Sequence, residues 1–420
     1  MKMIVRKLML FGLIQFCTFQ IFGQYPSFDS LVSTYSDLPV RFDLRDSKRI
    51  SPVRVQAPGG CWAAAAMSSF ESFIQTATGN SFTFSDKNLY HFHGYDSTRT
   101  TYGNHMMATA YFVRGDGPFV STPEVDTLRQ SNPPDLIING ARFLPNNPRI
   151  IKNTIYQFGG VSTMLRFRPE TMDSLSFVHY SNTEKINHVV NLVGWDDEFV
   201  TNTGQGVWIA QNSLGLKSGD AGYFYIPYQD KSVLQYNAVW PEWCEYPESM
   251  KIIYYDTLGQ TSTYGFEDTV CYALVEFTAP GEGMLKTIGT WCTMENSIIQ
   301  ATIYKSFDKE HKQLGMVIGQ SENETCRFEG YYHLELVKPV KFTKGELFYV
   351  KVKYSTPTDT CRIPVERYVK QYAYPDLVSD KCWINPDENS WPETWYLCGK
   401  STDYPALQFD LCIKAYFYNE

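Results

Sequence analysis

Residues 59–70 read GGCWAAAAMSSF, in which one cysteine stands between a glycine pair and a run of alanines. The glycines indicate a turn, and the alanines with apolar residues at helical spacing predict a helix over residues 62–75. Cys61 therefore lies at the start of a helix, where unpaired amides and the helix dipole lower the pKa of a thiol. The thiolate is a nucleophile, so Cys61 is a candidate catalytic residue, although a single cysteine is more often simply buried.

Two polar residues further along the chain complete a candidate catalytic set. His188 begins an apolar strand predicted over residues 188–195, and Asn212 lies at the end of the next one, predicted over 206–213. They follow Cys61 by 127 and 151 residues (188 − 61 and 212 − 61). This order and spacing are typical of papain-like cysteine peptidases.

The local sequences extend that resemblance from about Leu38 to Asp230. Five ordered motifs are similar to those of the papain-like family: LP and FDLRD within 38–46, SPVRVQ (51–56) with GCWA (60–63), FSDKNL (84–89), NHVV with VGWDD (187–197), and QNS with GYF (211–224). The resemblance implies an α+β fold with two lobes, one helical and one β-barrel-like.

The same resemblance implies a role for each matching residue. Cys61 would be the nucleophile, His188 its general base and then general acid, and Asn212 the group that orients the imidazole. Gln56 would form the oxyanion hole together with the backbone amide of Cys61. A thiolate–imidazolium pair that attacks a carbonyl, with donors placed where negative charge develops, predicts peptide-bond hydrolysis through a thioester.

Some residues depart from the family pattern. Gln56 lies five residues before Cys61, one fewer than is usual, and Leu214 and Ser218 stand where the family has tryptophans. The tryptophan after Asn-Ser shields the Asn–His hydrogen bond from water, so its loss predicts a weaker bond and slow or absent turnover. The alternative is a catalytically weak or inactive relative that acts as a surface binding or adhesion module. A third alternative is that the same residues catalyse acyl transfer to an amine.

The character of the chain changes after about residue 240. A second helix is predicted over 150–158 and short strands over 161–167 and 222–228, whereas residues 250–420 show alternating runs such as 298–304, 331–337 and 347–354. Many short strands with turn signals predict an all-β sandwich or jelly roll. The segments 256–261 (DTLGQT) and 412–416 (CIKAY) resemble the lectin-like domain that follows such peptidase domains in some prokaryotic proteins.

The N-terminus has the layout of a secretory signal peptide. Lys2, Arg6 and Lys7 precede an apolar run over residues 8–22 that is short for a membrane span, with an uncleaved anchor as the alternative. We therefore expect a secreted, periplasmic or cell-surface protein. The predicted organisation is a signal peptide (1–23), a short linker (24–37), a papain-like domain (38–240) and a lectin-like β-sandwich domain (245–420).

Cysteine positions support an oxidising compartment. Of the ten cysteines, eight follow residue 240: Cys244, Cys271, Cys292, Cys326, Cys361, Cys382, Cys398 and Cys412. An even set in an exported chain predicts up to four disulfides, whose connectivity the sequence does not give. The alternative is a group of reduced, buried thiols. Cys61 has no neighbour in the chain with which to pair.

Charge and composition limit the classes of binding partner that we expect. With 37 basic and 45 acidic residues the formal net charge is −8, and no Lys/Arg block could neutralise a run of phosphates, so nucleic acid is not expected. No cofactor is expected. His91 and His93 have metal-ligand spacing but lack an acidic or cysteine companion, so no metal is expected either. The expected partner is a protein or peptide substrate.

The lectin-like segment offers one further candidate surface. A sugar-stacking or peptide-binding platform could be built from Trp383, Trp391 and Trp395 with Asp387 and Glu388. The stronger expectation is that these rings belong to the sandwich core. Such a platform would suit a carbohydrate or another cell-surface ligand.

Overall fold

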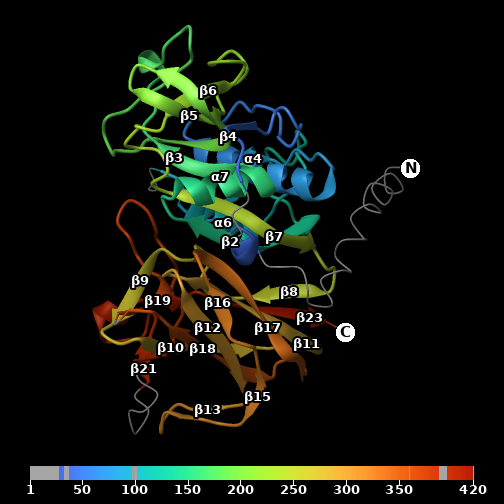
Figure 1. Ribbon diagram of the computed structural model, residues 1–420. Helices are drawn as coiled ribbons and strands as arrows, with labels where there is room; N and C mark the ends of the chain where they lie inside the picture. Colours follow the sequence, from blue (N-terminus) through green and yellow to red (C-terminus); the bar gives the residue numbers. More distant parts are fainter. Residues whose placement is uncertain are drawn as a thin grey trace, which may run out of the picture.

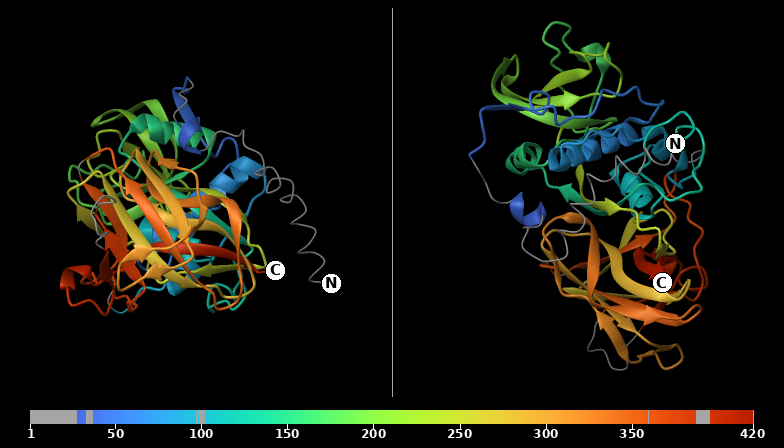
Figure 2. Two further views of the ribbon diagram at one scale, coloured as in Figure 1. Left: turned by 90° about the horizontal axis from the view of Figure 1, so that it is seen from below. Right: turned by 90° about the vertical axis from the view of Figure 1, so that its right-hand side faces the viewer.

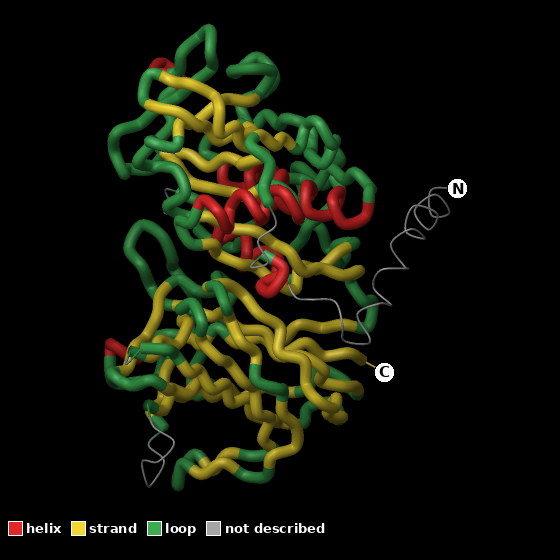
Figure 3. Tube along the Cα trace, viewed as in Figure 1, coloured by secondary structure: helices red, strands yellow, loops and turns green. Residues whose placement is uncertain are grey.

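Two stacked bodies make up the molecule, one with helices and strands up to about residue 245 and one built from strands from residue 250 onward (Figure 1). The computed structural model describes residues 28–32, 37–96, 98, 102–358, 360–386 and 395–419. The predicted signal peptide lies outside the described residues. Figure 3 shows the described α-helices in the first body or at its junction with the second, and the short helical segment in the second body is the 3-10 helix η3 (Pro405–Leu407).

Helix α4 (Cys61–Thr78) runs through the first body and begins at the predicted cysteine. It ends at Gly79, whose φ of 74° is a left-handed conformation that favours glycine. The other helices of this body are α5 (Asp86–Phe92), α6 (His105–Val113) and α7 (Pro148–Gln157). The sequence predicts α4 and α7 but not α5 and α6. Helix α5 is only seven residues long and α6 is buried on nearly every side, so neither shows helical periodicity.

The strands of the first body form one sheet against which α4 packs. Their order is β6-β5-β4-β3-β7-β2, with β1 paired to β4. They are β1 (Arg41–Asp43), β2 (Leu136–Leu144), β3 (Val161–Leu165), β4 (His188–Thr201), β5 (Gly204–Gln211), β6 (Tyr223–Pro227) and β7 (Asn237–Glu245). The antiparallel β4–β5 pair places the start of β4 beside the end of β5, because Asn191 lies opposite Gln211.

The second body is a β-sandwich. One sheet has the order β15-β12-β18-β10-β20-β21 with β16 on β12, and β17-β11-β23-β8 faces it across a core of aliphatic and aromatic side chains. These strands are β8 (Met250–Ile253), β10 (Val270–Thr278), β11 (Gly283–Cys292), β12 (Ser297–Tyr304), β15 (Val317–Gln320), β16 (Glu324–Cys326), β17 (Glu329–Phe342), β18 (Leu347–Ser355), β20 (Cys382–Asn385), β21 (Tyr396–Cys398) and β23 (Ile413–Asn419). Smaller pairings join β9 (Ser262–Phe266), β19 (Cys361–Glu366) and β22 (Asp410–Leu411), and β13 (Phe307–Asp308) with β14 (Gln313–Leu314). The expected all-β sandwich is confirmed.

One sheet runs without interruption through both bodies. Strand β2 of the first body pairs with β17 of the second, so that Phe143 lies opposite Glu329 and Ala141 opposite Tyr331. The result is an eleven-stranded sheet that includes β17-β11-β23-β8. Main-chain hydrogen bonds therefore hold the two bodies in one fixed orientation, which their separate sequence patterns do not predict.

A short helix, α3 (Phe28–Leu31), also contacts both bodies, beside the junction in Figure 2. The ring of Phe28 contacts Phe158 of the first body, with centroids 4.9 Å apart, and Phe328 of the second, at 6.4 Å. The Asp29 carboxylate accepts a hydrogen bond of 2.8 Å from Arg142. Residues 28–32, which belong to the predicted short linker 24–37, are therefore held in the junction by an apolar ring and an ion pair.

The expected disulfide framework is only partly formed. Cys271 and Cys361 are bonded, whereas Cys292, Cys326, Cys382, Cys398 and Cys412 are free thiols and Cys244 accepts a hydrogen bond from Asn139. Of the up to four disulfides predicted, one is present among the described residues. An even cysteine count carries no information about distance, and pairing requires two sulfur atoms at bonding geometry.

The described tryptophans of the platform candidate in the second body, Trp383 and Trp395, lie in the core of the sandwich and not on an exposed binding platform. Trp383 and Trp395 are 1% and 4% exposed and pack around Phe307. Trp391, Asp387 and Glu388 lie outside the described residues. A ring that packs inside the sandwich cannot stack on a sugar, so these two tryptophans do not form the expected binding platform.

Candidate active site

A hydrogen bond joins His188 to Asn212. The Nε2 atom of His188, the first residue of β4, lies 2.9 Å from the Oδ1 atom of Asn212, which directly follows β5. The Asn212 side chain is buried, with 3% of its residue surface exposed, and its Oδ1 also accepts the amide of Ser213 at 2.9 Å. The asparagine is therefore held in place and fixes the plane and tilt of the imidazole.

Cys61 faces the same space from the N-terminal end of α4. Its side chain and that of His188 line one cavity, and the backbone amide of Val189, the residue after the histidine, donates a hydrogen bond to its sulfur. Backbone groups of Trp62 and of Cys61 itself also lower the pKa of this thiol. Sequence positions 61, 188 and 212 are thus brought together at one place, because α4 packs against β4.

Burial and hydrogen bonding act in opposite directions on this thiol and imidazole. Burial raises the pKa of the Cys61 thiol, and the three backbone hydrogen bonds oppose that rise. Burial lowers the pKa of His188, and the Asn212 hydrogen bond opposes that fall. Both side chains are therefore uncharged before substrate binds, and His188 can accept the thiol proton. The amides and the helix N-terminus then favour the thiolate.

An aromatic ring covers the imidazole from a position that the sequence did not single out. Phe167, two residues after β3, stacks on His188 with ring centroids 5.2 Å apart. Its backbone amide and carbonyl are bonded to the Asn187 side chain at 2.7 and 3.0 Å, so its position is tied to the residue before the histidine. Leu214 is instead 40% exposed and bridges to Val55. The burial of Asn212 shows that the exposure expected from Leu214 does not reach the asparagine.

Gln56 lies beside the asparagine strand. The side-chain Oε1 of Gln56 accepts a hydrogen bond of 2.6 Å from the Ser213 hydroxyl, and the backbone amide of Gln56 donates to the Ser213 carbonyl at 2.9 Å. With Oε1 occupied in this way, the Nε2 end of the side chain is the one available to donate to a substrate oxygen.

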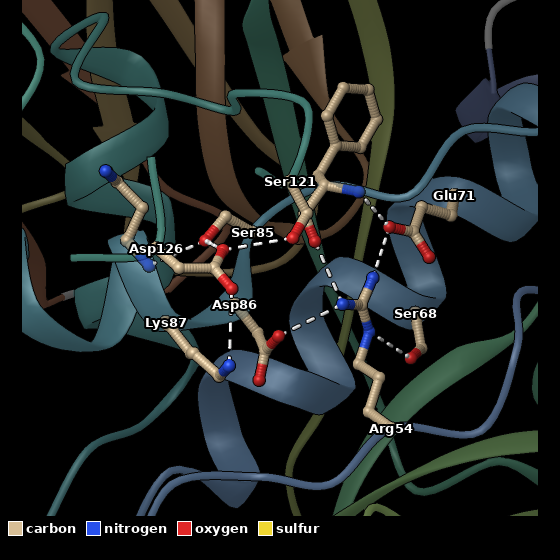
Figure 4. A network of polar contacts seen from close by, with 10 residues as sticks. Arg54, Ser68, Glu71, Ser85, Asp86, Lys87, Ser121 and Asp126 are labelled. Atoms are coloured by element: carbon tan, nitrogen blue, oxygen red, sulfur yellow. Dashed lines mark hydrogen bonds and ion pairs between the residues drawn. The ribbon is translucent and has the colours of Figure 1, made fainter. Parts of the chain in front are cut away.

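A buried ion cluster holds the segment that carries Gln56 (Figure 4). Arg54 donates to the Phe84 carbonyl at 2.9 Å, to Asp86 at 3.0 Å and to Ser68 at 3.3 Å, and it also pairs with Glu71. The Arg54 and Glu71 side chains are 9% and 1% exposed. This cluster ties the chain before Gln56 to helices α4 and α5, which fixes the loop although it is shorter than usual in papain-like peptidases.

The shared cavity is a cleft of about 970 Å³ with walls from both bodies. On the wall of the first body lie Gly59, Cys61, Met106, Phe143, Met164 and His188. The second body contributes Gln260, Cys292, Glu295 and Glu329. No sequence pattern indicated this second wall, because its residues lie far from the papain-like motifs and are brought to the cleft with the β2–β17 pairing.

Comparisons with known proteins place both bodies in described families. Residues 38–241 match the papain family of cysteine proteases, and residues 252–417 match the lectin-like domain family. Among curated proteins, a viral cathepsin of Adoxophyes honmai nucleopolyhedrovirus is 24% identical over 208 residues and a cysteine protease of Blomia tropicalis 28% over 225. Each alignment covers 47% of this chain, and 60% and 64% of those relatives.

A solved structure matches both bodies of the chain together. The cysteine protease and lectin-like domains of Cwp84, a surface layer associated protein of Clostridium difficile, align with a TM-score of 0.76 at 15% identity. That alignment covers 91% of this chain and 89% of the other. At this level of identity the match shows that the two chains share a fold.

Proposed function

Because the chain joins a papain-family cysteine protease domain to a lectin-like domain, we propose that it hydrolyses peptide bonds with Cys61 as the nucleophile. His188 acts as base and then acid, and Asn212 orients it. The observation that carries this proposal is the 2.9 Å bond between His188 and Asn212 in the cleft that Cys61 also lines.

The first half of the reaction forms an acyl-enzyme. His188 accepts the thiol proton of Cys61, and the sulfur attacks the carbonyl carbon of the scissile peptide bond. The carbonyl electrons move to oxygen, and when they return the carbon–nitrogen bond breaks. The imidazolium of His188 then gives its proton to the departing amine, which leaves a thioester on Cys61.

The second half returns the enzyme to its starting state. Neutral His188 removes a proton from a water molecule, the hydroxyl attacks the thioester carbonyl, and the carbon–sulfur bond breaks. The imidazolium reprotonates the sulfur, and the product carboxylic acid leaves. In both halves the negative oxygen accepts hydrogen bonds from the Cys61 amide and Gln56 Nε2, each of which contributes about 3–4 kcal/mol to the barrier reduction.

A thiol-reactive epoxide with a peptide recognition portion tests this assignment. The wild-type protein should be labelled at Cys61 and lose activity, and Cys61→Ala should be neither labelled at that site nor active. His188→Ala should react much more slowly. Cys244→Ala is a matched control, because it removes another partly exposed cysteine away from the cleft and should be labelled like wild type. Failure of wild-type Cys61 to react in a His188-dependent way would overturn the peptidase proposal.

Leu214 is exposed where the papain-like family has a tryptophan, so the same experiment also tests the alternative function, a binding or adhesion module without catalysis. Peptide binding in the cleft without labelling or turnover would indicate a binding or adhesion module. A product formed with an added primary amine, at the expense of the free acid, would indicate acyl transfer instead of hydrolysis.

We also propose that the protein is exported, with the lectin-like domain binding a carbohydrate or another cell-surface ligand. The charged-then-apolar order of residues 2–22 supports export. In the described part of the chain, no helix has the length and apolarity that a membrane crossing would need. N-terminal sequencing of the mature protein should begin near Gln24, and recovery of an uncleaved N-terminus in the membrane fraction would contradict cleavage.

A further inference from the structure

The lectin-like domain lies beside the peptidase domain and also forms part of the wall of the cleft. Glu329 is the first residue of β17, and the β2–β17 register places it opposite Phe143. Side chains of directly opposed residues in an antiparallel pair lie on the same face and close together. Glu329 therefore stands next to a ring that lines the cleft, and Glu295 reaches the same wall from the connection between β11 and β12.

Apolar side chains line the same cleft as these carboxylates. His105 contacts Phe143 edge to face, with centroids 4.6 Å apart, and burial lowers the pKa of His105 to about 4. His105 is therefore neutral at physiological pH. Because Met106 and Met164 also line the cleft, apolar side chains share its walls with Cys61 and the two acidic groups.

The two carboxylates have no cation bound to them. Among the described residues neither Glu295 nor Glu329 has an ion-pair partner, and Arg327 acts on Glu295 only at longer range. Burial raises the pKa of both, and the charge of Glu295 raises that of Glu329 further. Two like charges that line the same cleft repel each other, and this repulsion is relieved when a cation binds between them. The cleft's own arginine, Arg166, follows β3 and belongs to the peptidase domain.

We propose that Glu295 and Glu329 of the lectin-like domain select substrates that place a lysine or arginine side chain in the cleft lined by Cys61. The methylene groups of such a side chain pack along Phe143 and Met106 while its charged end reaches the carboxylates, as long basic side chains do at apolar surfaces with a polar edge. This inference rests on the proposed peptidase function, whose substrate class it defines.

The first test compares lysine with norleucine, which has the same straight chain without the charge. Fluorogenic peptides carry one or the other, in turn, at each of the three residues before the scissile bond. For the full chain we expect kcat/KM to favour lysine at one of these positions by about tenfold, and 0.5 M salt to reduce that ratio. The ratio should fall to about one in Glu295→Gln/Glu329→Gln and stay at the wild-type value in Glu335→Gln, an exposed glutamate further along β17 that does not line the cleft.

The second test is independent of turnover. Binding of the same peptides, without the fluorogenic group, is measured by fluorescence anisotropy on Cys61→Ala with and without the two glutamine substitutions. A lysine preference that the substitutions remove supports the inference, even where the wild-type protein fails to cleave and the peptidase proposal falls. Equal binding of lysine and norleucine peptides to Cys61→Ala, or a preference that survives the double substitution, would overturn the inference while leaving the thiol chemistry untouched.

Discussion

Replacement of Asn212 by alanine tests whether its hydrogen bond to His188 is what makes the imidazole an effective base and acid. The bond is 2.9 Å long and the asparagine is almost fully buried, so water cannot replace the lost acceptor without entering the core. A hydrogen bond to a group that becomes charged contributes about 1.5–3 kcal/mol. Since each 1.36 kcal/mol is a factor of ten in rate, kcat/KM should fall about 10- to 150-fold.

The pH profile distinguishes this role from a general loss of stability. The Asn212 bond raises the pKa of His188 against the lowering effect of burial, so its removal lowers that pKa further. Acceptance of the thiol proton requires neutral imidazole, and the acid limb of kcat/KM, which reports protonation of His188, should therefore move to lower pH in Asn212→Ala. Asn212→Asp, which places a negative charge on the same atom position, should move that limb to higher pH.

The assay is peptide turnover from pH 5 to 10, with thermal melting to show that each variant is folded. Asn88→Ala is the matched control, because Asn88 is equally buried, donates to the Val125 carbonyl and does not line the cleft. It should lose stability but keep the wild-type pH profile. A loss of less than about threefold in Asn212→Ala with an unmoved acid limb would refute the reasoning.

Four further predictions follow from single contacts. Phe167→Ala removes the ring stacked on His188 and should lower kcat/KM about 2- to 10-fold, with partial recovery in the leucine variant. Burial raises the pKa of Glu366 to about 8. The folded state thus holds a proton that the unfolded chain releases near pH 4.5, so stability should decline between pH 5 and 8 by on the order of 3 kcal/mol, and Glu366→Gln should flatten this decline in urea titrations. Reduction of the Cys271–Cys361 bond should cost about 2–5 kcal/mol, and the Cys271→Ser/Cys361→Ser protein should be insensitive to reductant. Asp29→Ala leaves a buried arginine at the junction with one partner fewer and should lower the free energy of unfolding by about 2–3 kcal/mol, whereas an unchanged urea midpoint would show that α3 does not clamp the two bodies.

Much of the fold could be predicted because its signals are local. The glycine pair before the alanine run marks the start of α4, and two-residue alternation after residue 250 marks the strands of the sandwich. The expected papain-like fold followed by a lectin-like all-β domain is confirmed by the structure and by the family matches. The roles of Cys61, His188 and Asn212 stay predictions, although the structure brings these three residues to one cleft.

Other features depend on which surfaces meet, and no local pattern encodes them. Sulfur distances decide that Cys271 pairs with Cys361 while Cys382 and Cys398, opposite each other on β20 and β21, remain thiols. The ring that covers His188 comes from Phe167, a residue with no distinctive sequence context.

Residue order, spacing and the surrounding motifs therefore predicted the nucleophile, its partners in the chain and the division into a helix-containing and an all-strand part. The tertiary structure decided that the second part is a wall of the catalytic cleft, because main-chain hydrogen bonds between β2 and β17 set Glu329 beside Phe143. Those two residues are separated by 186 positions (329 − 143), and pairing over such a distance depends on the packing of both bodies at once.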